Sequence, residues 1–304
     1  MPGHVPVLME EAVQLLLTDP NGTYVDATLG GGGHAAAILR SLGEDGRLLG
    51  LDCDPAAVAR TRATPPAPEP RFMARRARFS QMEATLSDLG IDRVDGILAD
   101  LGISSDQLDD PARGLAHAAT GPLDMRLDPS LPVSADALLR ATDDQGLLRL
   151  LEEYGELPRA RATVRAIRRV LAEHAPITTS DLREALEPIY PGPARPRRLS
   201  QVFQALRIVV NHELAELESL LSFAPRAIRP GGTLCIIAYH SLEDRLVKTA
   251  LRPPHPSDPR IPVSESPWIP LTKKPLRPSV EECARNPRAR SARLRAGRRK
   301  GDAA

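Results

Sequence analysis

Residues 23–39, "TYVDATLGGGGHAAAIL", decide the fold, because an apolar run breaks there into four glycines and an alanine-rich stretch. The apolar run has the composition of a buried strand, and the stretch after His34 has helical spacing. Glycines between a strand and a helix let the chain turn tightly and bring main-chain amides close to a ligand. The stretch therefore predicts the first β–α unit of a ligand-binding sheet.

Further units of the same kind follow. The stretches at 47–52, 71–79 and 94–100 have strand character, and those at 54–63 and 81–90 have helical character. From about 110 to 198 only short helices are indicated. One long amphipathic helix with apolar residues from Val202 to Leu221 comes next, then a strand at 233–239 and a helix at 241–251 capped by Ser241 and Asp244. Strands alternating with helices predict a mostly parallel α/β sheet.

The simplest architecture is one α/β domain interrupted by an all-helical insert. Its predicted parts are residues 1–110, 111–198 and 199–304.

Composition limits the class of protein. The 304 residues are 42% hydrophobic and 26% charged, which is ordinary for globular proteins. No apolar run is long enough to span a membrane, and no signal segment is evident, so a cytoplasmic protein without a membrane partner is expected. Three cysteines without a CxxC or CxxH cluster argue against a disulfide framework and a metal site.

Charge is distributed unevenly. Residues 271–304 hold 11 Lys and Arg against 3 Asp and Glu, although the whole chain carries only +1. A basic end on an acidic body suggests a polyanionic partner, and a solvated tail is the alternative.

The predicted strand ends carry polar side chains. Asp26, Asp52, Asp100 and His240 lie at or just after four of them. Ligands of open α/β sheets bind beyond the carboxyl ends of the strands, so these side chains are expected to converge. Asp52 follows Gly32 by 20 residues, the usual distance of a carboxylate that holds ribose hydroxyls. An adenosine-containing cofactor is predicted.

The glycine pattern narrows the choice of cofactor. No Gly-Lys-Ser/Thr follows, which excludes a Walker loop, whereas Gly30, Gly32 and Ala35 nearly fit a dinucleotide pattern. S-adenosyl-L-methionine (SAM) has no pyrophosphate, and its amine and sulfonium favour nearby carboxylates such as Asp26 and Asp100. SAM is favoured, while a nicotinamide cofactor and a purely structural turn remain open.

Two loops offer polar groups near the predicted site. The stretch 100–110 contains Ser104 and Gln107, which would orient a substrate or simply cap a helix. In the loop "YHSLEDR", His240 is either a base or a structural group, and Glu243 is expected to make a surface pair.

Seven stretches carry a resemblance to a known family. The chain resembles the bacterial 16S ribosomal RNA cytosine-N4 methyltransferases of the RsmH (MraW) type. The matching stretches, in chain order, are "HVPVL" (4–8), "DATLGGGGH" (26–34), "DGILADLGISSDQLDD" (95–110), "GPLDMRLD" (121–128), "FQALRIVVNHEL" (203–214), "HSLEDR" (240–245) and "NPRARSARLR" (286–295).

This resemblance implies a class I SAM-dependent methyltransferase fold (Rossmann-like) with a helical insert. It also implies methylation of N4 of one cytidine in the decoding centre, cytidine 1402 in the usual rRNA numbering, with 16S rRNA, within the 30S subunit, as partner. In that family the matching positions contact SAM: Gly32, Gly33, His34, Asp52, Phe79, Asp100 and Gln107. Departures at 157–167 and at Ser200 and Gln201 concern RNA contacts more than the cofactor.

The catalytic and RNA-binding groups are less well defined. Asp100, a main-chain carbonyl of residues 101–105, or Ser104 would orient the N4 group, and Tyr239 or, second, Trp268 would stack on the base. His240, Arg288 and Arg290 are further substrate-binding candidates. The arginines of 285–299 and those of 159–169 are candidates for phosphate contacts. The run "ARSARLRA" is either an edge strand with solvated arginines or, as favoured, a strand that also contributes positive surface.

Two other classes of function remain open at this stage. A nicotinamide-dependent oxidoreductase would share the first β–α–β unit, and a non-catalytic ribosome-assembly protein would keep the basic surfaces. The sequence does not fix the oligomeric state, although an exposed insert could mediate a homodimer.

Overall fold

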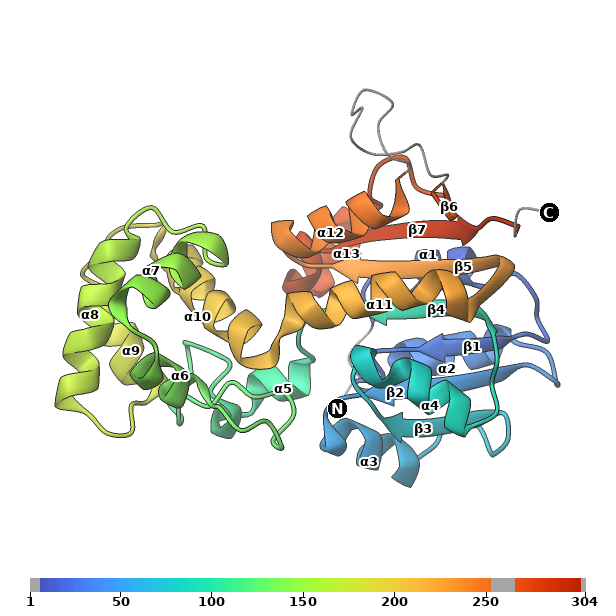
Figure 1. The fold of residues 1–304 in the computed structure, drawn as a ribbon, viewed down its shortest axis with the longest axis horizontal. Helices are drawn as coiled ribbons and strands as arrows, with labels where there is room; N and C mark the ends of the chain where they lie inside the picture. The colour runs from blue at the N-terminus through green and yellow to red at the C-terminus, as the bar shows by residue number, and fades with distance from the viewer. Residues whose placement is uncertain (1–5, 253–265, 302–304) are drawn as a thin grey trace. The chain divides into compact units, whose positions relative to one another are not determined.

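The computed structural model describes residues 6–252 and 266–301 and contains two compact units (Figure 1). The sheet unit comprises Met1–Gly102 and Leu214–Ala304, and the helical unit comprises Ile103–Glu213. The helical unit thus extends beyond the predicted 111–198 at both ends. In the described ranges, no helix is long and apolar enough to cross a membrane.

The sheet unit contains a seven-stranded sheet with the order β3-β2-β1-β4-β5-β7-β6. The first five strands in this order are parallel, and β7 pairs antiparallel with both β5 and β6. The predicted mostly parallel α/β fold is therefore confirmed. The strands are β1 (Thr23–Asp26), β2 (Arg47–Asp52), β3 (Phe72–Arg76), β4 (Val94–Asp100), β5 (Ile228–Ala238), β6 (Trp268–Pro270) and β7 (Arg293–Arg299).

Helices cover both faces of this sheet and bury two apolar cores. One core packs strand residues against α4 (Met82–Asp88), α11 (Glu213–Ala227) and α12 (Ser241–Leu251). The other core packs them against α1 (Met9–Leu16), α2 (Gly33–Ser41) and α3 (Pro55–Ala63). Burial on both faces explains why the central strands are apolar almost throughout. The unit also contains η1 (Phe79–Gln81), α13 (Val280–Arg285) and η3 (Pro287–Ser291).

The strand order creates a switch point at β1. The chain passes from β1 through β2 to β3 on one side, then returns to place β4 on the other side. Ligand sites of open α/β sheets form at such a point, beyond the carboxyl ends of the strands. Asp26 and Asp100 end the two strands that border it.

The helical unit is built from short helices, as predicted. In α8 (Ala160–Glu173), for example, Val164, Ile167 and Val170 are buried, while Arg161, Arg165 and Arg169 are exposed. Its other elements are α5 (Ser105–Asp109), η2 (Pro111–Arg113), α6 (Ala135–Ala141), α7 (Asp144–Glu153), α9 (Thr179–Leu186) and α10 (Arg195–Asn211).

The single long helix predicted around 202–221 is wrong. It is two helices, because α10 ends at Asn211, α11 begins at Glu213, and His212 between them has a φ of 55°. The Asn211 side chain donates to the Met125 carbonyl at 2.8 Å and accepts from the Leu127 amide at 2.7 Å. A buried contact with a segment distant in sequence thus accompanies the end of the helix.

The strand predicted near the C-terminus exists, but the alternative interpretation of it as an edge strand with solvated arginines is wrong. β7 lies between β5 and β6, so both of its sides are paired. Arg295 is buried, and its Nε lies 2.7 Å from Oδ1 of Asp244. Trp268, the second candidate for base stacking, begins β6 and is only 2% exposed.

Candidate active site

The glycine loop connects β1 to α2 and bends sharply. Gly30 and Gly32 have φ values of 49° and 77°, a region that glycine occupies without strain. Gly33 begins α2, and a Cβ atom there would lie 2.4 Å from Cγ of Pro6. Gly31 differs, because a Cβ atom there would meet nothing within 4 Å. The loop is thus packed on one side at Gly33 and open at Gly31.

Asp52 ties this loop to the end of β2. Its Oδ2 accepts a hydrogen bond from the Gly30 amide at 2.8 Å, and its Oδ1 accepts one from the Asp54 amide at 2.8 Å. Burial raises the pKa of Asp52 above its usual value, although both hydrogen bonds oppose the rise. Each carboxylate oxygen can accept further bonds, so Asp52 remains able to bind a pair of hydroxyls.

Asp26 ends β1 and is 1% exposed. Its Oδ1 accepts from the Thr28 amide at 3.2 Å, whereas its Oδ2 has no hydrogen-bond partner in the described part of the chain. Burial raises the pKa of Asp26 to about 6. A buried carboxylate oxygen without a donor is costly and is expected to have a use.

His34 lies beside Asp26 in the first turn of α2 and is also buried. Its Nε2 lies 3.2 Å from the Val7 carbonyl, which can only accept, so Nε2 must carry the proton. Its Nδ1 then faces Oδ2 of Asp100 at 3.7 Å. Burial lowers the pKa of His34, which keeps the imidazole neutral near pH 7.

Asp100 ends β4 and is bonded to Tyr239 across 139 residues of sequence. The Tyr239 hydroxyl donates to Oδ1 of Asp100 at 2.8 Å, and the Asp100 amide donates to Oγ1 of Thr28 at 2.6 Å. Burial raises the pKa of Asp100 to about 7, and Glu243 adds to the rise while the Tyr239 bond opposes it. Asp26, Asp52 and Asp100, three of the four strand-end side chains predicted to converge, therefore do so.

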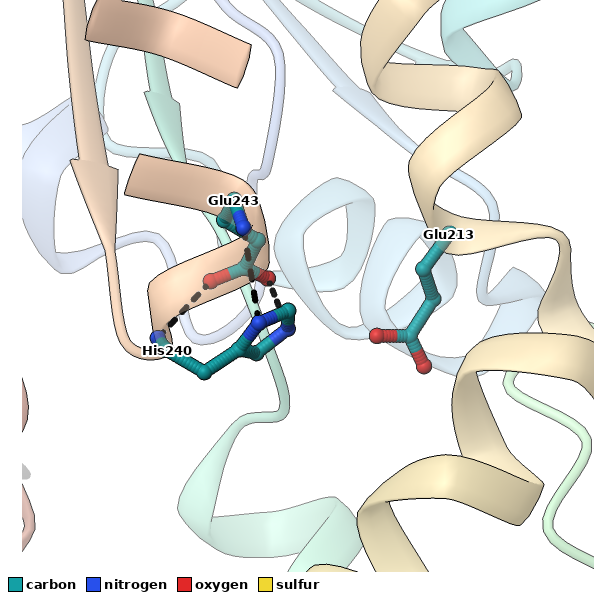
Figure 2. A group of neighbouring side chains, drawn as sticks. All are labelled: Glu213, His240 and Glu243. Carbon is teal, nitrogen blue, oxygen red and sulfur yellow. Dashed lines mark hydrogen bonds and ion pairs between the residues drawn. The ribbon is translucent and has the colours of Figure 1, made fainter. Parts of the chain in front are cut away.

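The turn from β5 into α12 is held by His240 and Glu243 (Figure 2). Oε2 of Glu243 accepts from the amides of Tyr239 and His240, and the Glu243 amide donates to Nδ1 of His240. His240 Nε2 lies 3.1 Å from Glu243 Oε1.

Two predictions about this turn are wrong. The cap of α12 is His240 with Glu243, whereas Asp244 pairs with Arg295 instead. Glu243 is 3% exposed, and it bonds to the Tyr239 and His240 amides inside the protein, whereas a surface pair was expected.

The remaining predicted residues lie in three places. Phe79 begins η1, is half-buried, and packs against the sheet core. Ser104 and Gln107, in the helical unit, form the capping box of α5 through bonds of 3.2 and 2.9 Å. Arg288 and Arg290 are exposed on η3.

Sequence reasoning missed several supporting residues. Thr28 receives the Asp100 amide, Pro6 covers Gly33, and Glu282 accepts from the Leu8 amide at 2.8 Å. The last contact joins residues 274 positions apart, so no local pattern marks it.

Residues 1–300 match the MraW methylase family. The chain belongs to the MraW methylase family. Two curated relatives named ribosomal RNA small subunit methyltransferase H are similar over nearly the whole chain. The relative from Sorangium cellulosum is 46% identical, covering 99% of this chain and 92% of its own. That from Thermomicrobium roseum is 45% identical, covering 97% of this chain and 93% of its own.

A solved rRNA methylase from Streptococcus thermophilus is also similar to this MraW methylase. The two structures align with a TM-score of 0.40 and 10% sequence identity, and the alignment covers 96% of this chain and 93% of the Streptococcus thermophilus chain. That likeness is too low to add to the assignment.

The cofactor of this MraW methylase is SAM. The residues fit it in three respects. Oδ2 of Asp26 has no donor within the described residues, Gly31 leaves open space beside the loop, and Asp52 presents a carboxylate at the end of β2. A ligand with an ammonium group and a ribose would match these groups.

Proposed function

We propose that this MraW methylase transfers a methyl group from SAM to N4 of a cytidine in the decoding centre of 16S rRNA, cytidine 1402 in the usual numbering. The names of its relatives support ribosomal RNA of the small subunit as the substrate. The 30S subunit is the proposed form of that substrate. The choice of cytosine N4 rests on the family resemblance.

One observation about the site carries the proposal. Asp26 and Asp100 are electrostatically coupled, burial raises the pKa of each, and neither pairs with a Lys or Arg among the residues that the structure describes. Two carboxylates without a basic partner favour a cationic ligand. SAM has an ammonium and a sulfonium group, whereas a nicotinamide dinucleotide brings an anionic pyrophosphate that Asp26 and Asp100 would repel.

The sheet unit holds the cofactor through residues already placed. Asp52 would bind the ribose hydroxyls, the amides of the glycine loop would approach the cofactor backbone, and Asp26 would bind the amine. When bound, SAM supplies a methyl group on a sulfonium that leaves as a neutral thioether.

The chain must also orient a weak nucleophile. The lone pair of cytosine N4 is delocalised into the ring, so an acceptor that holds the N4 hydrogens would turn that lone pair toward the methyl group. Asp100 is the proposed acceptor in its ionised form, and alignment of this kind can lower a barrier by up to about 7–11 kcal/mol. After the N–C bond has formed, the proton would leave N4 for the Asp100 carboxylate, which then releases it to solvent.

The RNA must be held with its target base out of the stack. Tyr239 remains the proposed stacking residue, and Arg288 and Arg290, both exposed, are proposed to contact phosphates. The site roles proposed for Ser104, Gln107 and His240 require the caps of α5 and α12 to open to substrate or cofactor.

The deciding experiment measures transfer of radiolabelled methyl from SAM to 30S subunits that lack this modification. Digested nucleosides are analysed by mass, and 16S rRNA alone is assayed beside the subunits. Asp100→Ala tests the site, and Asp92→Ala, which removes an exposed carboxylate before β4, is the matched control.

Label in N4-methylcytidine that is lost in Asp100→Ala but kept in Asp92→Ala is the expected result. Label on another atom of the base would overturn the N4 assignment. Binding of SAM without any labelled RNA would require another methyl acceptor, and no binding of SAM would overturn the proposal as a whole.

A further inference from the structure

We infer that Tyr239 is a positioning residue for Asp100: its hydroxyl holds Asp100 in the ionised form and fixes which of its two oxygens stays available to the reacting groups. This inference rests on the proposed function of Asp100 as the acceptor of the N4 hydrogens. It gives Tyr239 a role through its hydroxyl, distinct from the stacking role of its ring.

The geometry of the pair carries the inference. The hydroxyl of Tyr239 donates to Oδ1 of Asp100 at 2.8 Å, which is an ordinary length for a strong O–H···O bond. Among residues 6–252 and 266–301, no other side chain donates a hydrogen bond to this carboxylate. Oδ2 faces Nδ1 of His34 at 3.7 Å, beyond hydrogen-bond reach.

The Tyr239 side chain is itself held from two directions. Its amide donates to Oε2 of Glu243 at 2.8 Å, which fixes the end of β5 against α12. Its ring lies over Gly102, where a Cβ atom would be 3.5 Å from the ring and φ is 101°. The hydroxyl therefore reaches Asp100 from a backbone that is anchored independently of Asp100.

None of the other charged or titratable groups described around Asp100 stabilises its ionised form, so the Tyr239 hydroxyl has that role alone. Asp26 from β1 and Glu243 from α12 are acidic and oppose ionisation of Asp100. Glu282 from α13 acts on Tyr239 in the same sense, raising the pKa of the phenol so that it stays a donor. His34 from α2 is neutral near pH 7 because burial lowers its pKa.

Loss of the Tyr239 hydroxyl is expected to raise the pKa of Asp100. A hydrogen bond to the charged form lowers the pKa, so its removal raises the pKa further. Asp100 starts at about 7, and loss of a bond to a charged group corresponds to roughly one unit or more. The active, ionised form would then be depleted at neutral pH and restored at higher pH.

The test compares Tyr239→Phe, which removes only the hydroxyl, with Tyr190→Phe. Tyr190 is a matched control in the helical unit, because it is also buried and its hydroxyl makes one short bond, to Thr163 at 2.6 Å. The first readout is the NMR titration of the Asp100 carboxyl carbon in the protein without cofactor, assigned by its loss in Asp100→Asn. The second is kcat/KM for methyl transfer as a function of pH.

In Tyr239→Phe the Asp100 titration is expected to move up by about one pH unit, and the acid limb of kcat/KM by the same amount. The variant would be about eightfold slower than the unaltered protein at pH 6.5 and nearly equal to it at pH 9. Tyr190→Phe should move neither midpoint.

Two outcomes would overturn the inference. An unchanged Asp100 titration would show that the phenol does not hold the ionised form. Loss of activity by the same factor at every pH would assign Tyr239 to packing or base stacking instead. Failure of the proposed function is distinguishable, because the unaltered protein would then methylate no RNA while the titration still reports on the pair.

Discussion

At the scale of single residues, two glycines of the same loop, Gly31 and Gly33, are glycine for different reasons. Gly33 has no room for a methyl group because Pro6 lies against it, whereas Gly31 faces open space. The first is therefore required by packing within the protein. The second has no packing reason to be glycine, and its φ is not positive, so we propose that a ligand approaches the main chain closely there.

Alanine substitutions at these two positions are expected to separate stability from binding. Gly33→Ala should lower the free energy of unfolding by about 1–3 kcal/mol, the usual cost of overpacking. Gly31→Ala should leave it nearly unchanged and weaken SAM binding by about tenfold or more, because its methyl group would occupy space meant for the cofactor. Urea unfolding and calorimetric titration with SAM measure the two effects. Unaltered SAM affinity in Gly31→Ala would show that the cofactor does not approach this residue.

At the scale of elements, α8 has a charge pattern that packing does not explain. Arg161, Arg165 and Arg169 recur every four residues on its exposed side, and the first turn contains no acidic residue. Positive charge at a helix N-terminus opposes the helix dipole and costs a few tenths of a kcal/mol or more. Arg168 differs, because its Nε lies 2.6 Å from Asp144 and it therefore has a structural role.

Removing two of the exposed arginines is expected to weaken RNA binding without unfolding the protein. In Arg161→Gln/Arg165→Gln the slope of log K against log salt should fall by up to about 2, since each lost phosphate contact releases fewer counterions. Arg40→Gln/Arg47→Gln, which removes two exposed arginines of the sheet unit, is the control. Filter binding of 16S rRNA between 50 and 200 mM salt, a range of about fourfold, gives the slopes. Equal slopes in both variants would show that the exposed arginines of α8 do not contact the RNA phosphates.

At the scale of the whole molecule, sequence predicted what local patterns encode. The α/β alternation, the helical interruption and the converging carboxylates follow from periodicity and from the positions of strand ends. The break at His212 does not, because it accompanies contacts of Asn211 with residues near 125. The interior position of β7 and the Tyr239–Asp100 bond likewise depend on segments that meet only after folding.

The buried carboxylates also predict how the stability of the whole molecule depends on pH. The pKa of Asp26 is about 6 in the folded protein and 3.8 without the fold, so the folded state binds the proton more tightly. Its contribution to stability is therefore complete below about pH 4 and is lost as the pH rises through 6. Between pH 5 and pH 7.5 the loss from this one group is about 1.4 kcal/mol.

Asp26→Asn should remove this dependence while keeping a similar shape. We expect the free energy of unfolding of the unaltered protein to fall, relative to that of Asp26→Asn, by about 1.4 kcal/mol from pH 5 to pH 7.5. Asp92→Asn should follow the unaltered protein, because Asp92 is exposed. Urea unfolding without cofactor at both pH values measures the difference. Parallel behaviour of Asp26→Asn and the unaltered protein would mean that Asp26 is ionised throughout this range, and Asp26 would then carry its negative charge before any cofactor binds.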